Sequence, residues 1–209
     1  MNNAFKDYPN LRINKNIDFY NYFIPFFENG KCIYILPRLS NEKYEMHKHS
    51  GLEKPPKIMN LRGIPSQIFN FQEVLNGKVV FITEGWCDAL SIETLGYNAL
   101  ALNGVSNINL FIKKLKNVKD YINKYYVIAF DLDNPGTLAR DKLSMELTSL
   151  KCKVKHLYPY GNNIKDINDM LLKNKDKLKN ELKNIIDDIN FKFTEWNKYK
   201  RYKQYIYSN

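Results

Sequence analysis

Short apolar runs alternate with helical patterns through the middle of the chain. Runs rich in β-branched and aromatic residues predict buried strands at 79–83, 98–102, 125–130 and 154–158. Between them, apolar positions recur at helical spacing and predict helices over 88–95, 108–115 and 137–150. Strands that alternate with helices are typical of a parallel sheet covered on both faces. The pattern therefore predicts an α/β fold, a parallel sheet flanked by helices, in residues 77–172.

Two stretches of different character flank this domain. In residues 1–76, Asn29-Gly30 separates two apolar segments, which predicts a β-hairpin over residues 24–38. Residues 173–209 combine many lysines with a helical pattern. We therefore expect a small N-terminal α+β subdomain and a basic C-terminal helical extension on either side of the α/β domain.

Charge makes an acidic partner the first expectation. The 209 residues are 44% hydrophobic, enough for a packed core, and carry a formal net charge of +10. Nucleic acid is the expected partner, with an anionic membrane surface second. No apolar run approaches the roughly 18 residues of a membrane-spanning helix, and the N-terminus lacks a signal-peptide pattern. We expect a cytoplasmic protein with no membrane partner.

Cysteine and histidine usage points away from structural zinc. The three cysteines are an odd set with wide spacing, and they form neither a CxxC pair nor a disulfide framework. His47 and His49 lie near no cysteine, and we expect them in an exposed hairpin or loop. No zinc site is therefore expected.

Carboxylates follow two of the predicted strands. Glu84 comes directly after the first strand, and Asp131 and Asp133 come after the third. Because ligands of parallel α/β sheets bind outside the carboxyl ends of the strands, these side chains are expected at one site. Oxygen ligands suit Mg²⁺ or Mn²⁺, and metal-bound carboxylates in a basic chain suggest a phosphate-bearing substrate.

Each acidic cluster also has a simpler interpretation. Asp131 and Asp133 can bind one ion, or they can form an acidic turn that only caps the following helix. Glu84 can bind metal or act as a general base, whereas Asp88 can simply be a favourable charge at a helix N-terminus. Asp166 can add a further metal-site carboxylate. Asp169, one helical turn on, can cap or flank its helix.

The clusters together resemble a known family. The segment 84–91, EGWCDALS, followed by DLDNPG at 131–136, resembles the Toprim domain of primases, topoisomerases and related nucleases. The sequence of segment 84–91 is most similar to bacterial replicative primases and phage primase-helicases. Residues 165–169 resemble the KDxN element of those primases. The resemblance implies a Toprim-like sheet.

The N-terminal part extends the resemblance to about residues 24–172. Residues 30–38 resemble the hairpin of the primase catalytic core, and residues 57–60 resemble its PKYLN segment. Two positions depart from the pattern: Pro37 replaces a glycine, and Ile58 replaces an aromatic residue. A zinc-binding domain before this core and a helicase motor after it are not expected. The compact chain favours a phage, plasmid or other mobile element as its source.

Roles for single residues follow from the resemblance. Glu84 would be the general base or a metal ligand near the attacking 3′-hydroxyl, and Asp88 would support it. The divalent ions would be held by Asp131, Asp133 and Asp166. Template or nucleotide phosphates would be contacted by Arg38, Lys57 and Arg62.

The implied reaction is nucleotidyl transfer by a DNA primase, which makes short RNA primers on single-stranded DNA from NTPs. A separately encoded replicative helicase is a possible partner. Two other classes stay open: a Toprim nuclease, and a non-catalytic nucleic-acid-binding accessory protein of replication. The first would use the same carboxylates for hydrolysis.

The C-terminal extension has two interpretations. It carries ten Lys or Arg against five Asp or Glu, and Lys198 and Arg201 lie among aromatic residues. Such a segment can follow a single strand through phosphate contacts and base stacking. Alternatively, a helix face of Ile185, Ile186, Ile189 and Phe193 packs on the core and leaves the lysines in solvent.

Overall fold

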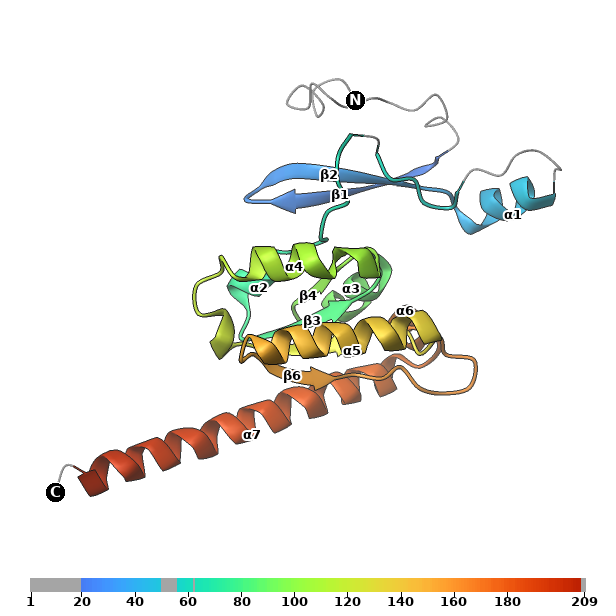
Figure 1. Cartoon of the computed structure of the whole chain (residues 1–209). Helices are drawn as coiled ribbons and strands as arrows, with labels where there is room; N and C mark the ends of the chain where they lie inside the picture. The colour runs from blue at the N-terminus through green and yellow to red at the C-terminus, as the bar shows by residue number, and fades with distance from the viewer. Residues whose placement is uncertain (1–19, 50–55, 62, 208–209) are drawn as a thin grey trace.

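The computed structural model describes residues 20–49, 56–61 and 63–207 (Figure 1). Its N-terminal elements are β1 (Tyr22–Glu28), β2 (Lys31–Arg38), α1 (Asn41–His49) and α2 (Glu73–Asn76). The central elements are β3 (Val79–Thr83), α3 (Trp86–Glu93), β4 (Ala99–Ala101), α4 (Ile108–Leu115), β5 (Tyr125–Ala129), α5 (Asn134–Ser149) and β6 (Lys153–His156). The chain ends with α6 (Ile167–Lys173) and α7 (Lys175–Tyr207).

A four-stranded parallel sheet forms the centre of the molecule, which confirms the predicted α/β fold. Its strand order is β4-β3-β5-β6, and each neighbouring pair is parallel. The connection from β3 leads outward to β4, and the connection from β5 leads outward to β6 on the other side. The connections after β3 and β5 therefore lead to opposite edges of the sheet, and α/β sheets form their binding crevice between two such strands.

Alternation along the strands builds a core on each face of the sheet. One face buries Phe81, Ala99 and Val127 against residues of α3, α6 and α7. The opposite face buries Val80, Leu100 and other side chains against α4 and α5. Since both faces are covered, the strands are apolar at successive positions rather than alternating with polar residues. Figure 1 shows these helices on both sides of the sheet.

The predicted hairpin packs on the first of these two cores. Strands β1 and β2 pair antiparallel around Asn29 and Gly30, both of which have positive φ. Phe26 of β1 lies edge-on to Phe69, with ring centroids 5.2 Å apart. Phe69 in turn pairs with Ala101 at the edge of β4. The N-terminal stretch and the sheet therefore share one hydrophobic core.

Helix α7 closes the same core from the other end of the chain. Leu178, Leu182 and Ile189 are buried, and Ile185 and Ile186 are partly buried against the core. The predicted packed helix face is confirmed for these isoleucines, whereas the side chain of Phe193 lies outside the described residues. Figure 1 shows α7 passing beside β6 and extending beyond the body.

Some element boundaries differ from prediction. Helix α3 begins two residues early, and α5 begins at Asn134 because the Asp133 side chain caps it. His47 and His49 were expected in a hairpin or loop, but they lie on α1. The hydroxyl of Ser40 accepts the Lys43 N–H at 3.1 Å, a helix-capping bond that favours this helix.

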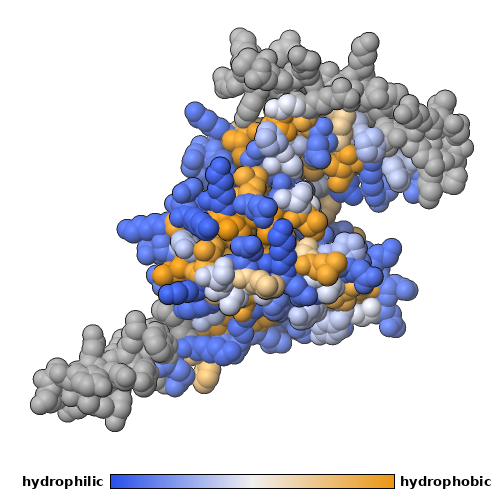
Figure 2. Space-filling view, viewed as in Figure 1, coloured by the Kyte–Doolittle hydropathy of each residue, from blue (hydrophilic) through white to orange (hydrophobic). Residues whose placement is uncertain are grey.

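Polar and apolar side chains both lie on the described surface. Figure 2 shows hydrophilic residues and groups of hydrophobic residues side by side over the face in view. Among the described residues, no helix is long and apolar enough to cross a membrane.

We expect Leu182→Ala to destabilise the protein by about 2–5 kcal/mol, because a fully buried leucine leaves a cavity in the core. Thermal unfolding checks this, with Leu172→Ala as the matched control, since Leu172 on the neighbouring α6 is 74% exposed. Equal melting temperatures for the two variants would show that α7 does not contribute to the core.

Candidate active site

The candidate site lies at the carboxyl ends of β3 and β5, whose connections lead to opposite edges of the sheet. A cavity of about 550 Å³ opens there. It gathers six of the residues that the sequence singles out, from five separate segments of the chain: Arg38, Lys57, Glu84, Asp88, Asp131 and Asp166. The structure thus places predicted acids and predicted phosphate contacts on the walls of one cavity.

Glu84 occupies the turn from β3 into α3. The Asn103 N–H donates to its carbonyl at 2.8 Å, which fixes the backbone of this turn to the loop after β4. Its side-chain atom Oε1 is buried and has no hydrogen-bond partner. Burial, followed by repulsion from Asp131 and Asp133, raises the pKa of Glu84 to about 7. An unpaired buried acceptor among other acids is suited to a proton or a cation.

Asp131 and Asp133 take different positions despite their close spacing. Asp131 lines the cavity, and burial together with repulsion from Asp166 and Asp133 raises its pKa to about 6. Asp133 is exposed and caps α5 by accepting the Gly136 N–H at 2.7 Å. The structure thus shows Asp133 in the simpler of its two predicted roles, as a helix cap. Metal binding by Asp133 stays a prediction.

Gly136 allows these acidic segments to lie close together. A methyl group on its α-carbon would lie 2.5 Å from the Asp131 carbonyl oxygen and 2.6 Å from Glu84 Oε1. Real side chains do not approach other atoms this closely, so the first turn of α5 can approach β3 and β5 only with glycine at this position.

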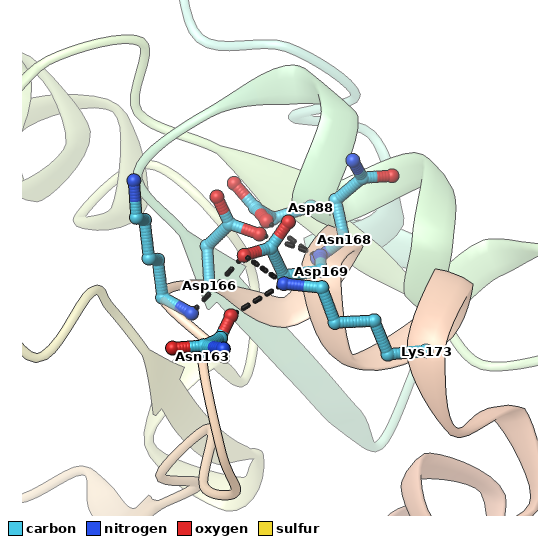
Figure 3. A network of polar contacts seen from close by, with 7 residues as sticks. Asp88, Asn163, Asp166, Asn168, Asp169 and Lys173 are labelled. Carbon is cyan, nitrogen blue, oxygen red and sulfur yellow. Dashed lines mark hydrogen bonds and ion pairs between the residues drawn. The ribbon is translucent and has the colours of Figure 1, made fainter.

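Asp88 connects α3 to the first turn of α6, which Asp166 caps (Figure 3). Asp88 is 7% exposed, and its Oδ1 accepts the Asn168 N–H at 2.9 Å. Asp166 caps α6 by accepting the Asp169 N–H at 2.7 Å. Burial is the main cause that raises the pKa of Asp88 to about 7, with repulsion from Asp166 and Asp131 adding to it. Both carboxylates are therefore held in place by main-chain donors.

Asp169 has a separate structural role at the far side of this network. Its Oδ2 accepts from the Lys165 N–H at 3.3 Å and pairs with Lys173 Nζ at 3.2 Å. Lys173 also donates to the Asn163 carbonyl. Asp169 thus ties α6 to the loop before it, in keeping with a flanking role.

Two of the three predicted phosphate contacts, Arg38 and Lys57, lie on adjacent backbone segments because residues 57–59 run along the end of β2. The Leu39 N–H donates to the Lys57 carbonyl at 2.9 Å, and the Met59 N–H donates to the Pro37 carbonyl at 3.1 Å. Arg38 is held over Trp86 at 5.1 Å from the ring centroid and donates to Cys87 Sγ at 3.0 Å. The hairpin therefore places the Arg38 guanidinium at the start of α3.

Three predicted binding residues cannot be placed in this way. Arg62 lies outside the described residues, and so do the side chains of Lys198 and Arg201, whose backbone forms part of α7. Sequence reasoning missed Asn168, which positions Asp88, and Arg140, which is buried beneath Asp131. A basic residue in the middle of a helix usually belongs to a solvated face, so Arg140 gave no signal.

The residues fit a divalent cation chemically, although they are not arranged as a finished site. Among the described residues, no group of three or more His, Cys, Asp or Glu side chains is close enough to hold a metal ion. The unpaired Glu84 Oε1 and the mutual repulsion of the acids are nevertheless what a bound cation would relieve.

Comparison with known proteins gives this arrangement a family. Residues 81–171 match the model of the Toprim-like family. This part of the chain is a Toprim-like domain. Among curated proteins, no sequence gives a significant match.

The similarity to solved structures covers more of the chain than the Toprim-like domain. The chain resembles the Aquifex aeolicus primase, solved as its zinc-binding and RNA polymerase domains, with 21% identity over 79% of this chain and 39% of that chain (TM-score 0.53). It also resembles the primase fragment of the bacteriophage T7 primase-helicase, with 18% identity over 75% of this chain and 59% of that chain (TM-score 0.51). A third similar structure is the RNA polymerase domain of Mycobacterium tuberculosis primase DnaG, with 17% identity over 77% of this chain and 53% of that chain (TM-score 0.53).

These comparisons show a primase-like fold around the Toprim-like domain, as the sequence motifs predict. The identities, between 17% and 21%, support the fold alone. The chain spans 39–59% of the lengths of these three structures.

In metal-free buffer with EDTA, we expect Glu84→Gln to stabilise the protein increasingly as the pH rises from about 4 to about 7. A glutamate has an ordinary pKa of 4.5, whereas the pKa of Glu84 in the fold is about 7. Over this window the folded protein keeps a proton that the unfolded chain releases, so wild-type stability falls as the pH rises. Glutamine lacks this proton and escapes the loss.

The measurement is the difference in melting temperature between Glu84→Gln and wild type across this pH range. Each kcal/mol of stability gained corresponds to about 2–4 °C. Glu146→Gln on α5, away from the cavity, is the control and should show no growing gain. A Glu84→Gln difference that stays constant with pH would contradict the raised pKa of Glu84.

Proposed function

We propose that this protein is a divalent-metal-dependent nucleotidyltransferase of the primase type, which makes short RNA primers on single-stranded DNA in the cytoplasm. The observation that carries the proposal is the cavity that joins the Toprim-like carboxylates to Arg38 and Lys57 of the N-terminal stretch. Toprim domains bind divalent metals, and the similar structures are primase domains. The likeness to primase structures covers 75–79% of the chain and so extends beyond the Toprim-like domain, which favours primase over nuclease.

Each group has a role in the proposed reaction. Glu84, Asp131 and Asp166 would hold Mg²⁺ or Mn²⁺, with Asp133 as a further ligand. When bound, the ions would activate the attacking 3′-hydroxyl and neutralise the leaving pyrophosphate. Glu84 would also be placed to accept the hydroxyl proton.

The remaining cavity residues would position the reacting groups. Asp88, fixed by the Asn168 N–H, would orient the start of α3 beside Glu84. Arg38 and Lys57 would bind template or nucleotide phosphates as cations at the cavity wall. Arg62 would add to them. A separately encoded helicase is a partner that the primase-helicase likeness supports.

Incubation with single-stranded DNA, labelled NTPs and Mg²⁺ or Mn²⁺ should yield short oligoribonucleotides. Glu84→Gln and Asp131→Asn should lower the rate by roughly 10²–10⁴-fold, because each removes a carboxylate at nearly constant volume. Asp133→Asn should also abolish primer synthesis if Asp133 binds metal. Since asparagine caps a helix about as well as aspartate, this variant separates metal binding from capping.

Asp176→Asn on the exposed start of α7 is the matched control and should keep full activity. Full activity in Asp131→Asn would contradict the proposed metal site. DNA shortening that is lost in Glu84→Gln would replace primase with nuclease, and no product from either reaction would favour a binding role.

If the distal part of α7 binds DNA, Lys198→Ala combined with Arg201→Ala should weaken single-strand affinity. The slope of log affinity against log salt should flatten by about 0.7 for each lost phosphate contact. Fluorescence anisotropy over a range of salt concentrations measures both quantities. Lys179→Ala with Lys183→Ala, on the packed half of α7, is the matched control. Unchanged binding in the distal variant would leave α7 as a packing element.

A further inference from the structure

Arg140 is a buried cation that none of the roles above uses. It lies in the middle of α5 and is 5% exposed. Its Nη2 donates to the Phe130 carbonyl at 3.1 Å and to the Asp131 carbonyl at 2.8 Å. These two carbonyls flank the α-carbon of Asp131, so holding both constrains the backbone from which the Asp131 carboxylate projects.

The same guanidinium also contacts the chain after β6. It lies 4.8 Å from the ring centroid of Tyr158, which stacks on His156 with centroids 5.8 Å apart. The chain beyond Tyr158 leads through the loop to Asp166. Arg140 therefore joins the ends of two neighbouring strands, each of which supplies a carboxylate to the cavity.

Packing around the Asp131 carbonyl leaves this arrangement little freedom. Its oxygen accepts from Arg140 on one side and is bounded on the other by Gly136, where even a methyl group would approach to 2.5 Å. Loss of the guanidinium would leave the buried Phe130 carbonyl and the partly buried Asp131 carbonyl without this donor. The carbonyls would then have to move or take up water, and the Asp131 carboxylate would move with them.

The charges of the nearby acids explain how Arg140 can be buried at this position. Burying a cation costs several kcal/mol unless nearby groups compensate it. The hydrogen bonds described for Arg140 go to main-chain carbonyls, while its Nε has no partner. The nearby acids supply the compensation, since Arg140 lowers the pKa of both Glu84 and Asp131.

We propose that Arg140 is a positioning residue for the divalent cation, which fixes the backbone of the Asp131 turn through its two hydrogen bonds. This inference rests on the proposed function only through the presence of a metal at this edge. It makes α5 part of the active-site architecture, through a residue that never reaches the cavity wall.

The test measures Mn²⁺ binding to the full chain, without nucleotide or DNA, by electron paramagnetic resonance of free Mn²⁺. Arg140→Met removes both hydrogen bonds that hold the Asp131 backbone, and it should weaken Mn²⁺ affinity about 10–100-fold, as for groups that orient metal ligands. Arg140→Lys keeps a donor that can restore one of the two hydrogen bonds, and it should be intermediate. Lys142→Met, an exposed position on the same helix, should bind Mn²⁺ as wild type does.

Melting temperature and circular dichroism separate positioning from folding. If Arg140→Met does not fold, Arg140→Lys decides the question. Folded Arg140 variants that bind Mn²⁺ within about twofold of wild type would overturn the inference while leaving the metal site intact. Absence of Mn²⁺ binding by wild-type protein would instead overturn the metal site, and the inference with it.

Discussion

Burial of acidic side chains at the carboxyl ends of β3 and β5, to which like-charge repulsion adds, is the constraint on which the rest of this structure depends. Glu84, Asp88 and Asp131 are each buried enough for the pKa of the carboxyl to rise to between about 6 and about 7. Water would screen such charges, but the packed sheet excludes much of it. Buried acids with raised pKa values that line one cavity are typical of functional sites, and a bound cation would relieve their repulsion.

The fold holds these acids in place with main-chain donors and one buried cation. The Asn168 N–H holds Asp88, the Asp169 N–H holds Asp166, and Arg140 holds the backbone of Asp131. None of these bonds neutralises a carboxylate as a direct ion pair would. The acids therefore stay oriented but only partly compensated, a state in which a divalent cation would be bound more strongly than by acids already paired.

Basic residues reach the same cavity only because the N-terminal hairpin shares a core with the sheet. Phe26 packs on Phe69, and Phe69 pairs with the edge of β4, so the position of β2 relative to α3 is set by apolar packing. Arg38 then meets Trp86 and Cys87 at the start of α3. The division of the chain into three stretches stays a prediction, but the hydrophobic core itself runs through all three.

The sequence pattern predicted the parallel sheet and its acidic edge well, because strand runs such as 79–83 and 125–130 are apolar on both faces and each ends at an acid. Cap chemistry was harder to anticipate. Asp133 serves as the cap that starts α5 early, and Ser40 starts a helix in place of the expected hairpin or loop. Arg140 was invisible, since nothing in a helical pattern distinguishes a buried arginine from a solvated one.

Asp133 shows why spacing alone could not assign the metal ligands. Two carboxylates two residues apart, at the end of a strand, can share an ion only if the following turn keeps them together. Here the turn directs Asp131 to the cavity and Asp133 to the Gly136 N–H. That cap needs only an acceptor oxygen, which asparagine would supply equally well. The negative charge of Asp133 raises the pKa of Glu84, and capping of the helix does not require that charge. We therefore group Asp133 with the acidic residues of the cavity.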